Sequence, residues 1–146
     1  MFNRSSKIVE DLSTTALIDL AVASGLMIGS SFIFLYHLDE INSHTKSVTS
    51  IETLLYVGWI SDTLARMTGG LICYFKIQNF DEHLFAIIAC SLNLLGFVLL
   101  FFTSTMYYTI VLVSVAYGLW WTIPALIICS RVNVTNFAHN WSIILA

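Results

Sequence analysis

The stretch that decides the fold runs from Met106 to Ser130 and reads MYYTIVLVSVAYGLWWTIPALIICS, without one charged side chain. A second uncharged stretch, from Leu84 to Thr103, reads LFAIIACSLNLLGFVLLFFT. A helix needs about 20 consecutive, mostly apolar residues to cross the hydrocarbon core of a bilayer. Both stretches therefore predict membrane-spanning helices.

Two earlier stretches extend this pattern towards the N-terminus. Leu20 to Leu38 carries no formal charge, and Thr53 to Phe75 is apolar except for Asp62 and Arg66. The short connections predict antiparallel helices that are adjacent in space. We expect an all-α, polytopic transmembrane bundle over 13–146, after a polar N-terminal tail over 1–12. Its helices are expected at about 16–38, 53–75, 84–103 and 106–130, with a truncated fifth from about 137, and 39–52 as a loop.

The composition indicates the same class of protein. Hydrophobic residues make up 58% of the 146 residues, and charged residues only 10%. An ordinary soluble domain has roughly 25% charged residues. We therefore expect a multi-pass integral membrane protein with the lipid bilayer as its surroundings. The formal net charge of −3 offers no basic face for a phosphate backbone, which excludes nucleic acid as a partner.

The basic residues next to the expected spans predict the orientation. With the N-terminus in the cytoplasm, Arg4, Lys7, Lys76 and Arg131 lie inside and only Lys46 lies outside. Cytoplasmic loops carry an excess of Lys and Arg. The tail over 1–12 is therefore expected on the cytoplasmic side.

The sequence contains no serine–histidine–aspartate set, phosphate-binding loop or zinc-protease motif. Its three cysteines are an odd number, and each lies within an apolar stretch. Such spacing suits neither a disulfide framework nor a zinc site. We expect no enzymatic activity, no cofactor and no metal site.

The stretch over 53–75 contains the most informative polar residues. Gly58, Asp62, Arg66 and Gly70 recur every four residues, which places them on one face of a helix. A charge inside the bilayer costs several kcal/mol, so it should face protein or water and find a partner. Asp62 and Arg66 can pair with each other. Either the pair is structural and fixes this helix in a bundle, or it opens and re-forms along a substrate pathway.

Small residues on two other stretches predict close helix packing. Gly25 and Gly29 form a small-residue motif in the first expected helix, and Gly118 lies in the last complete one. Glycines at this spacing let neighbouring backbones approach closely in membranes. Gly58 and Gly70 are expected to serve the same purpose on the helix between them.

Several other polar or bulky residues within the apolar stretches need a place inside the bundle. Pro124 lies within the last complete helix, where it removes a backbone hydrogen bond and bends the axis. Such a kink either supports gating, as in transporters, or is structural with no gating role. Trp120 and Trp121 lie too deep for the membrane interface, so we expect one of them to face the interior. Asn93 predicts a hydrogen bond between helices.

Three segments together resemble a known family. They are Trp59-Ile-Ser-Asp-Thr-Leu-Ala-Arg66-Met-Thr-Gly-Gly70, Tyr117-Gly-Leu-Trp-Trp121-Thr-Ile-Pro124-Ala, and Asn136-Phe-Ala-His-Asn140-Trp. They are similar to motifs of the nodulin-like, nuclear-fusion-defective-type transporters of the major facilitator superfamily, relatives of monocarboxylate carriers. Their order matches helices seven to eleven of the twelve in that family. The chain differs from the family pattern at Asp62, Ala65 and Ala138.

The resemblance implies a partial C-terminal half of a transporter that carries a small, monocarboxylate-like solute by alternating access. The missing N-terminal helical half would be its partner. Arg66 then matches the family arginine, and Asp62, Trp121 and Pro124 are candidate transport or gating residues. The alternative is a small multi-pass protein that transports nothing and assembles with partner helices, or an inactive remnant.

Overall fold

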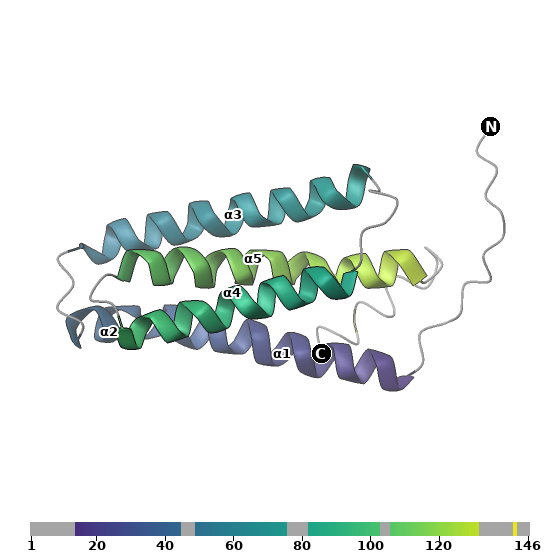
Figure 1. Ribbon diagram of the computed structural model, residues 1–146, viewed down its shortest axis with the longest axis horizontal. Coiled ribbons are helices and arrows are strands. Elements are labelled where there is room, and N and C mark those ends of the chain that lie inside the picture. The colour runs from purple at the N-terminus through teal and green to yellow at the C-terminus, as the bar shows by residue number, and fades with distance from the viewer. Residues whose placement is uncertain (1–13, 45–48, 76–81, 103–105, 132–141, 143–146) are drawn as a thin grey trace.

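The computed structural model describes residues 14–44, 49–75, 82–102, 106–131 and 142. Within these residues the chain forms α-helices and no strand, which confirms the predicted all-α fold (Figure 1). The helices are α1 (Thr14–Tyr36), α2 (Leu38–His44), α3 (Ile51–Phe75), α4 (Glu82–Phe102) and α5 (Met106–Arg131). The expected tail over 1–12 and the expected helix from about 137 lie outside the described helices.

Among the described helices, three are long and apolar enough to cross a membrane. They are α1 over Thr15–Tyr36, α4 over His83–Phe101 and α5 over Met106–Ile127. Four were expected. Helix α3 has 25 residues, which is long enough for a span. However, it carries Glu52, Asp62 and Arg66, so its apolar content is lower than that of the other three.

Helix α5 forms the centre of the bundle. It packs against α3, α4 and α1, and Figure 1 shows it running between α3 on one side and α4 and α1 on the other. Half of its apolar span is buried, compared with 28% for α1 and 22% for α4. A helix that is apolar on all sides suits such a position, because every face can be covered by protein or lipid.

Two apolar clusters hold the other helices against α5. The first joins Phe34 of α1 and Leu38 of α2 to Leu54 of α3 and to the first half of α5. The second joins Ala65 of α3 and Ala89 of α4 to the second half of α5. Trp120, only 4% exposed, lies in this second cluster. This confirms that one of the two adjacent tryptophans faces the interior.

The structure differs from the expected connections in two places. Residues 39–44, expected within the loop over 39–52, continue from Leu38 as α2, with Asp39 and Glu40 in its first turn and His44 in its last. The two acidic side chains stabilise the N-terminal end of the helix dipole, and the buried Leu38 fixes the helix to the core. In addition, α3 and α4 follow one another in sequence but are separated by α5.

Candidate functional site

Asp62 and Arg66 form an ion pair on α3. The Nε group of Arg66 donates a hydrogen bond of 2.9 Å to Oδ1 of Asp62, across one turn of the helix. This pairing confirms the prediction from their spacing of four residues. The side chain of Asp62 is 22% exposed and that of Arg66 is 42% exposed. Both charges therefore lie at the surface of the described bundle and not in its sealed core.

Two aromatic rings of α5 hold the guanidinium group of Arg66. Its Cζ atom lies 5.5 Å from the centre of the Tyr117 ring and 5.4 Å from that of the Trp121 ring. The two rings meet edge to face at 6.1 Å. A cation over an aromatic face is stabilised by about 0.5–2 kcal/mol, and more as water is removed. The structure thus brings Trp121 to the charged pair and adds Tyr117 to the predicted set.

Glycines allow the backbones of α3 and α5 to approach one another. A Cβ atom at Gly118 would lie 2.8 Å from Cβ of Ala65 and 2.9 Å from Oδ1 of Asp62. At Gly58 it would lie 3.1 Å from Oγ of Ser114. Gly58 and Gly118 therefore lie where packing glycines were expected. Because these glycines have no side chain, α3 and α5 can approach closely and the carboxylate of Asp62 can lie against α5.

The other three expected packing glycines lie elsewhere. At Gly25, Gly29 and Gly70 a Cβ atom would have no neighbour within 4 Å among the described residues. They face away from the described helices, so they do not act as packing positions between them. Instead, Gly69 lies against Thr122 and Gly96 against Val113. Sequence reasoning missed both, because neither has another glycine four residues away.

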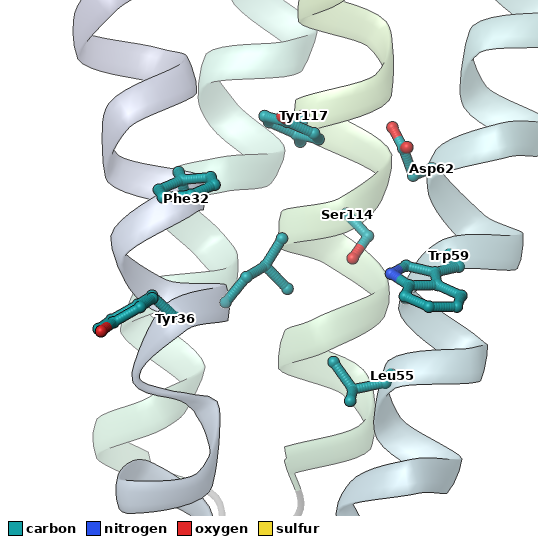
Figure 2. Close-up of a pocket in the computed structure, with 9 residues that line it drawn as sticks. Phe32, Tyr36, Leu55, Trp59, Asp62, Ser114 and Tyr117 are labelled. Carbon is teal, nitrogen blue, oxygen red and sulfur yellow. The ribbon is translucent and has the colours of Figure 1, made fainter.

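A pocket of about 340 Å³ lies next to the charged pair, between α1, α3 and α5 (Figure 2). Helix α1 contributes Phe32, Leu35 and Tyr36, helix α3 contributes Leu55, Gly58, Trp59 and Asp62, and helix α5 contributes Ser114 and Tyr117. Figure 2 shows Phe32 and Tyr36 on one wall, and Trp59 and Asp62 on the other. The pocket combines an apolar, aromatic lining with one carboxylate.

One hydroxyl group in the pocket lining lacks a hydrogen-bond partner. Ser114 is 2% exposed, and its Oγ atom has no partner in the described structure. Ser30 and Thr122 bond to their own backbone, at the carbonyls of Met27 and Leu119. The hydroxyls of Ser24 and Thr109 also lack a partner among the described residues, but neither residue lines the pocket. Figure 2 shows the hydroxyl oxygen of Ser114 and the indole nitrogen of Trp59 pointing toward one another. The lining therefore has hydrogen-bonding capacity that the protein itself leaves unused.

A separate polar contact joins α1 to α4. The side-chain amide of Asn93 donates to Oγ of Ser30 at 3.2 Å, and Oγ of Ser31 donates to Oδ1 of Asn93 at 3.4 Å. This confirms the predicted interhelical hydrogen bond of Asn93. We name this set, Ser30, Ser31 and Asn93, the α1–α4 seam. None of its three residues lines the pocket.

The remaining candidates lie outside this site. Pro124 is buried in α5, which continues to Arg131, and it does not line the pocket. Within the described residues no group of three or more His, Cys, Asp or Glu side chains is placed to hold a metal ion.

In comparisons with known proteins, no family model, no curated protein and no solved structure matches the chain. The arrangement of Asp62, Arg66 and the adjoining pocket is therefore the basis for a functional proposal.

Proposed function

We propose that the chain is a multi-pass integral membrane protein and forms part of a carrier for a small solute. The observation that supports this most is the placement of the Asp62–Arg66 pair. It lies next to a pocket of about 340 Å³ and among helices that are apolar enough to cross a membrane. Charged side chains within membrane helices face protein or water and mark solute and ion pathways.

The proposed mechanism is alternating access, and the chain acts as a carrier and not as an enzyme. In such carriers two helical bundles rock about a solute site near the middle of the membrane. The described bundle provides one set of helices, and a second helical half is the expected partner. The resemblance to nodulin-like and monocarboxylate carriers adds a major-facilitator architecture and a small-solute cargo to this proposal. Arg66 would then change its contacts with Asp62 and with the rings of Tyr117 and Trp121 as the pathway opens.

Uptake into vesicles tests this proposal. The complete gene product is reconstituted into liposomes, and the entry of labelled small organic anions and cations is measured. We expect one of these solutes to accumulate, and we expect Arg66→Ala to abolish most of its entry. Arg66→Lys keeps the positive charge but replaces the planar guanidinium group with an ammonium group, so it should retain partial uptake. Circular dichroism of each variant shows whether the helices persist. Full uptake by a folded Arg66→Ala protein would remove Arg66 from the mechanism.

A second candidate function follows from the glycines that face outward. Around Gly25, Gly29 and Gly70 the described structure leaves open space, so partner helices have room to approach there. A small membrane protein that transports nothing and assembles through these faces is consistent with this observation. In that case Gly25→Leu together with Gly29→Leu should reduce the yield of crosslinked partner proteins. Neither the original protein nor this variant should show solute uptake. The carrier proposal predicts uptake that depends on Arg66 instead.

A further inference from the structure

The pocket between α1, α3 and α5 has an uneven distribution of charge. Asp62 is the one charged side chain among its nine lining residues. Four of the nine are aromatic: Phe32, Tyr36, Trp59 and Tyr117. The lining therefore presents a carboxylate and several ring faces, whose negative quadrupoles attract cations. A carboxylate solute in this space would meet Asp62 without a cation in the lining to compensate for it.

Arg66 contacts the carboxylate of Asp62 at a single point. It reaches the carboxylate through Nε alone and at one oxygen, Oδ1. The second oxygen, Oδ2, has no partner in the described residues. The rest of the guanidinium group lies over the rings of Tyr117 and Trp121, and Arg66 does not belong to the lining. The positive charge is thus held to one side, while the carboxylate borders the pocket.

The unpartnered hydroxyl of Ser114 independently indicates a ligand. A buried polar group without a hydrogen bond costs about 1–3 kcal/mol, so structures rarely keep one without a reason. Ser114 lies in the lining next to Gly58, so its hydroxyl is an unpartnered polar group of the pocket wall. The pocket therefore offers a charge, ring faces and a hydrogen-bonding group within one volume.

We propose that this pocket binds a small organic ammonium compound, with Asp62 as its counter-ion and the aromatic side chains, Trp59 above all, as its walls. This inference rests on the proposed carrier function and names the class of solute. It departs from the monocarboxylate-like solute that the family resemblance implies, because the lining carries the opposite charge to the one that an organic acid needs. A volume of about 340 Å³ accommodates a molecule with a single ring and a cationic head.

Binding of a matched pair of probes tests the proposal. The complete gene product is placed in phosphatidylcholine nanodiscs, whose lipids carry no net charge. It is titrated calorimetrically with benzyltrimethylammonium and, separately, with benzoate, which has the same ring and the opposite charge. We expect saturable binding of the cation and none of the anion. Asp62→Asn keeps the shape of the side chain and removes its charge, and it should weaken binding of the cation by about 10-fold or more.

Two further variants keep the test decisive. Glu52→Gln removes a carboxylate from the same helix outside the pocket, so cation affinity should stay unchanged. Trp59→Leu alters a side chain that is 65% exposed and should leave the bundle folded even if Asp62→Asn does not. Loss of the cation–π contact should reduce affinity by about 3- to 30-fold. Preference for benzoate, or cation binding that neither variant weakens, would overturn the proposal.

The outcome is distinguishable from failure of the proposed carrier function. Cation binding that depends on Asp62, combined with no uptake of any solute into vesicles, would refute transport and leave the pocket assignment standing. Uptake of a labelled organic anion that depends on Arg66, with no cation binding, would refute the pocket assignment and support the carrier.

Discussion

The α1–α4 seam and the pocket beside α3 are both polar regions in an apolar bundle, but they are built differently. In the seam Asn93 is 5% exposed and exchanges hydrogen bonds with Ser30 and Ser31. Its groups are neutral and paired. At the pocket, Asp62 and Arg66 are charged and partly exposed, and the hydroxyl of Ser114 is unpaired. A closed neutral network stabilises helix association, whereas an open charged one costs stability and indicates function.

The largest effect is expected at the contact that brings Asp62 close to α5. Gly118→Ala would place a Cβ atom 2.8 Å from that of Ala65, so α3 and α5 must move apart. Overpacking of this kind typically costs about 1–3 kcal/mol. We expect a lower thermal midpoint by circular dichroism in detergent, together with weaker binding at the pocket.

Gly29→Ala is the matched control for that substitution. No heavy atom of the described structure lies within 4 Å of a Cβ at this position, and alanine favours a helix over glycine by about 0.5–1 kcal/mol. The two variants should therefore shift the midpoint in opposite directions. If both lower it equally, the close approach of α3 and α5 at Gly118 is wrong.

An intermediate effect is expected from breaking the ion pair. Arg66→Ala leaves the carboxylate of Asp62 without its partner. Because Arg66 is 42% exposed, we expect a loss of about 1–2 kcal/mol, below the roughly 3 kcal/mol of a charge at the bilayer centre. Removing Asp62 as well, in Asp62→Ala/Arg66→Ala, should recover more than half of this loss. The free energy of unfolding in nanodiscs is the measurement.

Glu52→Ala combined with Arg66→Ala provides the comparison, since it removes a carboxylate of α3 that does not pair with Arg66. It should recover nothing. Equal recovery by the two double variants would show that net charge, and not the specific pair, determines stability.

The sequence predicts those features of the molecule that depend on position along one helix. The long uncharged stretches predict the helices, and the spacing of Asp62 and Arg66 predicts their pairing. Features that depend on how one helix is rotated against another could not be predicted from the sequence. Tyr117 joins the site because α5 turns this residue towards Arg66, and no pattern within α5 specifies that rotation.

The glycines show the same division. Gly25 and Gly29 are four residues apart, yet the described helices leave them open, while Gly69 and Gly96 make close contacts without a second glycine at that spacing. Likewise, α5 is inserted between α3 and α4 although those two are sequence neighbours. A helix that is apolar on all sides can be recognised as central, but the helices that surround it depend on packing in three dimensions.

The smallest effect, and the one that separates the two polar regions most directly, concerns two buried serines. Ser31 lies within hydrogen-bond distance of Asn93 and of the carbonyl oxygen of Met27, so Ser31→Ala should cost about 0.6 kcal/mol, the average for such bonds in membranes. Ser114→Ala removes a hydroxyl without a partner, so it should leave stability unchanged or raise it by up to about 1 kcal/mol. Thermal midpoints in the same nanodiscs measure both. A loss at Ser114 as large as that at Ser31 would mean that its hydroxyl is already bonded within the protein, and the pocket would then lose its open polar group. Changes of opposite sign in the thermal midpoint would show that the polar atoms of the seam stabilise the bundle, whereas the hydroxyl of Ser114 in the pocket remains available for a ligand.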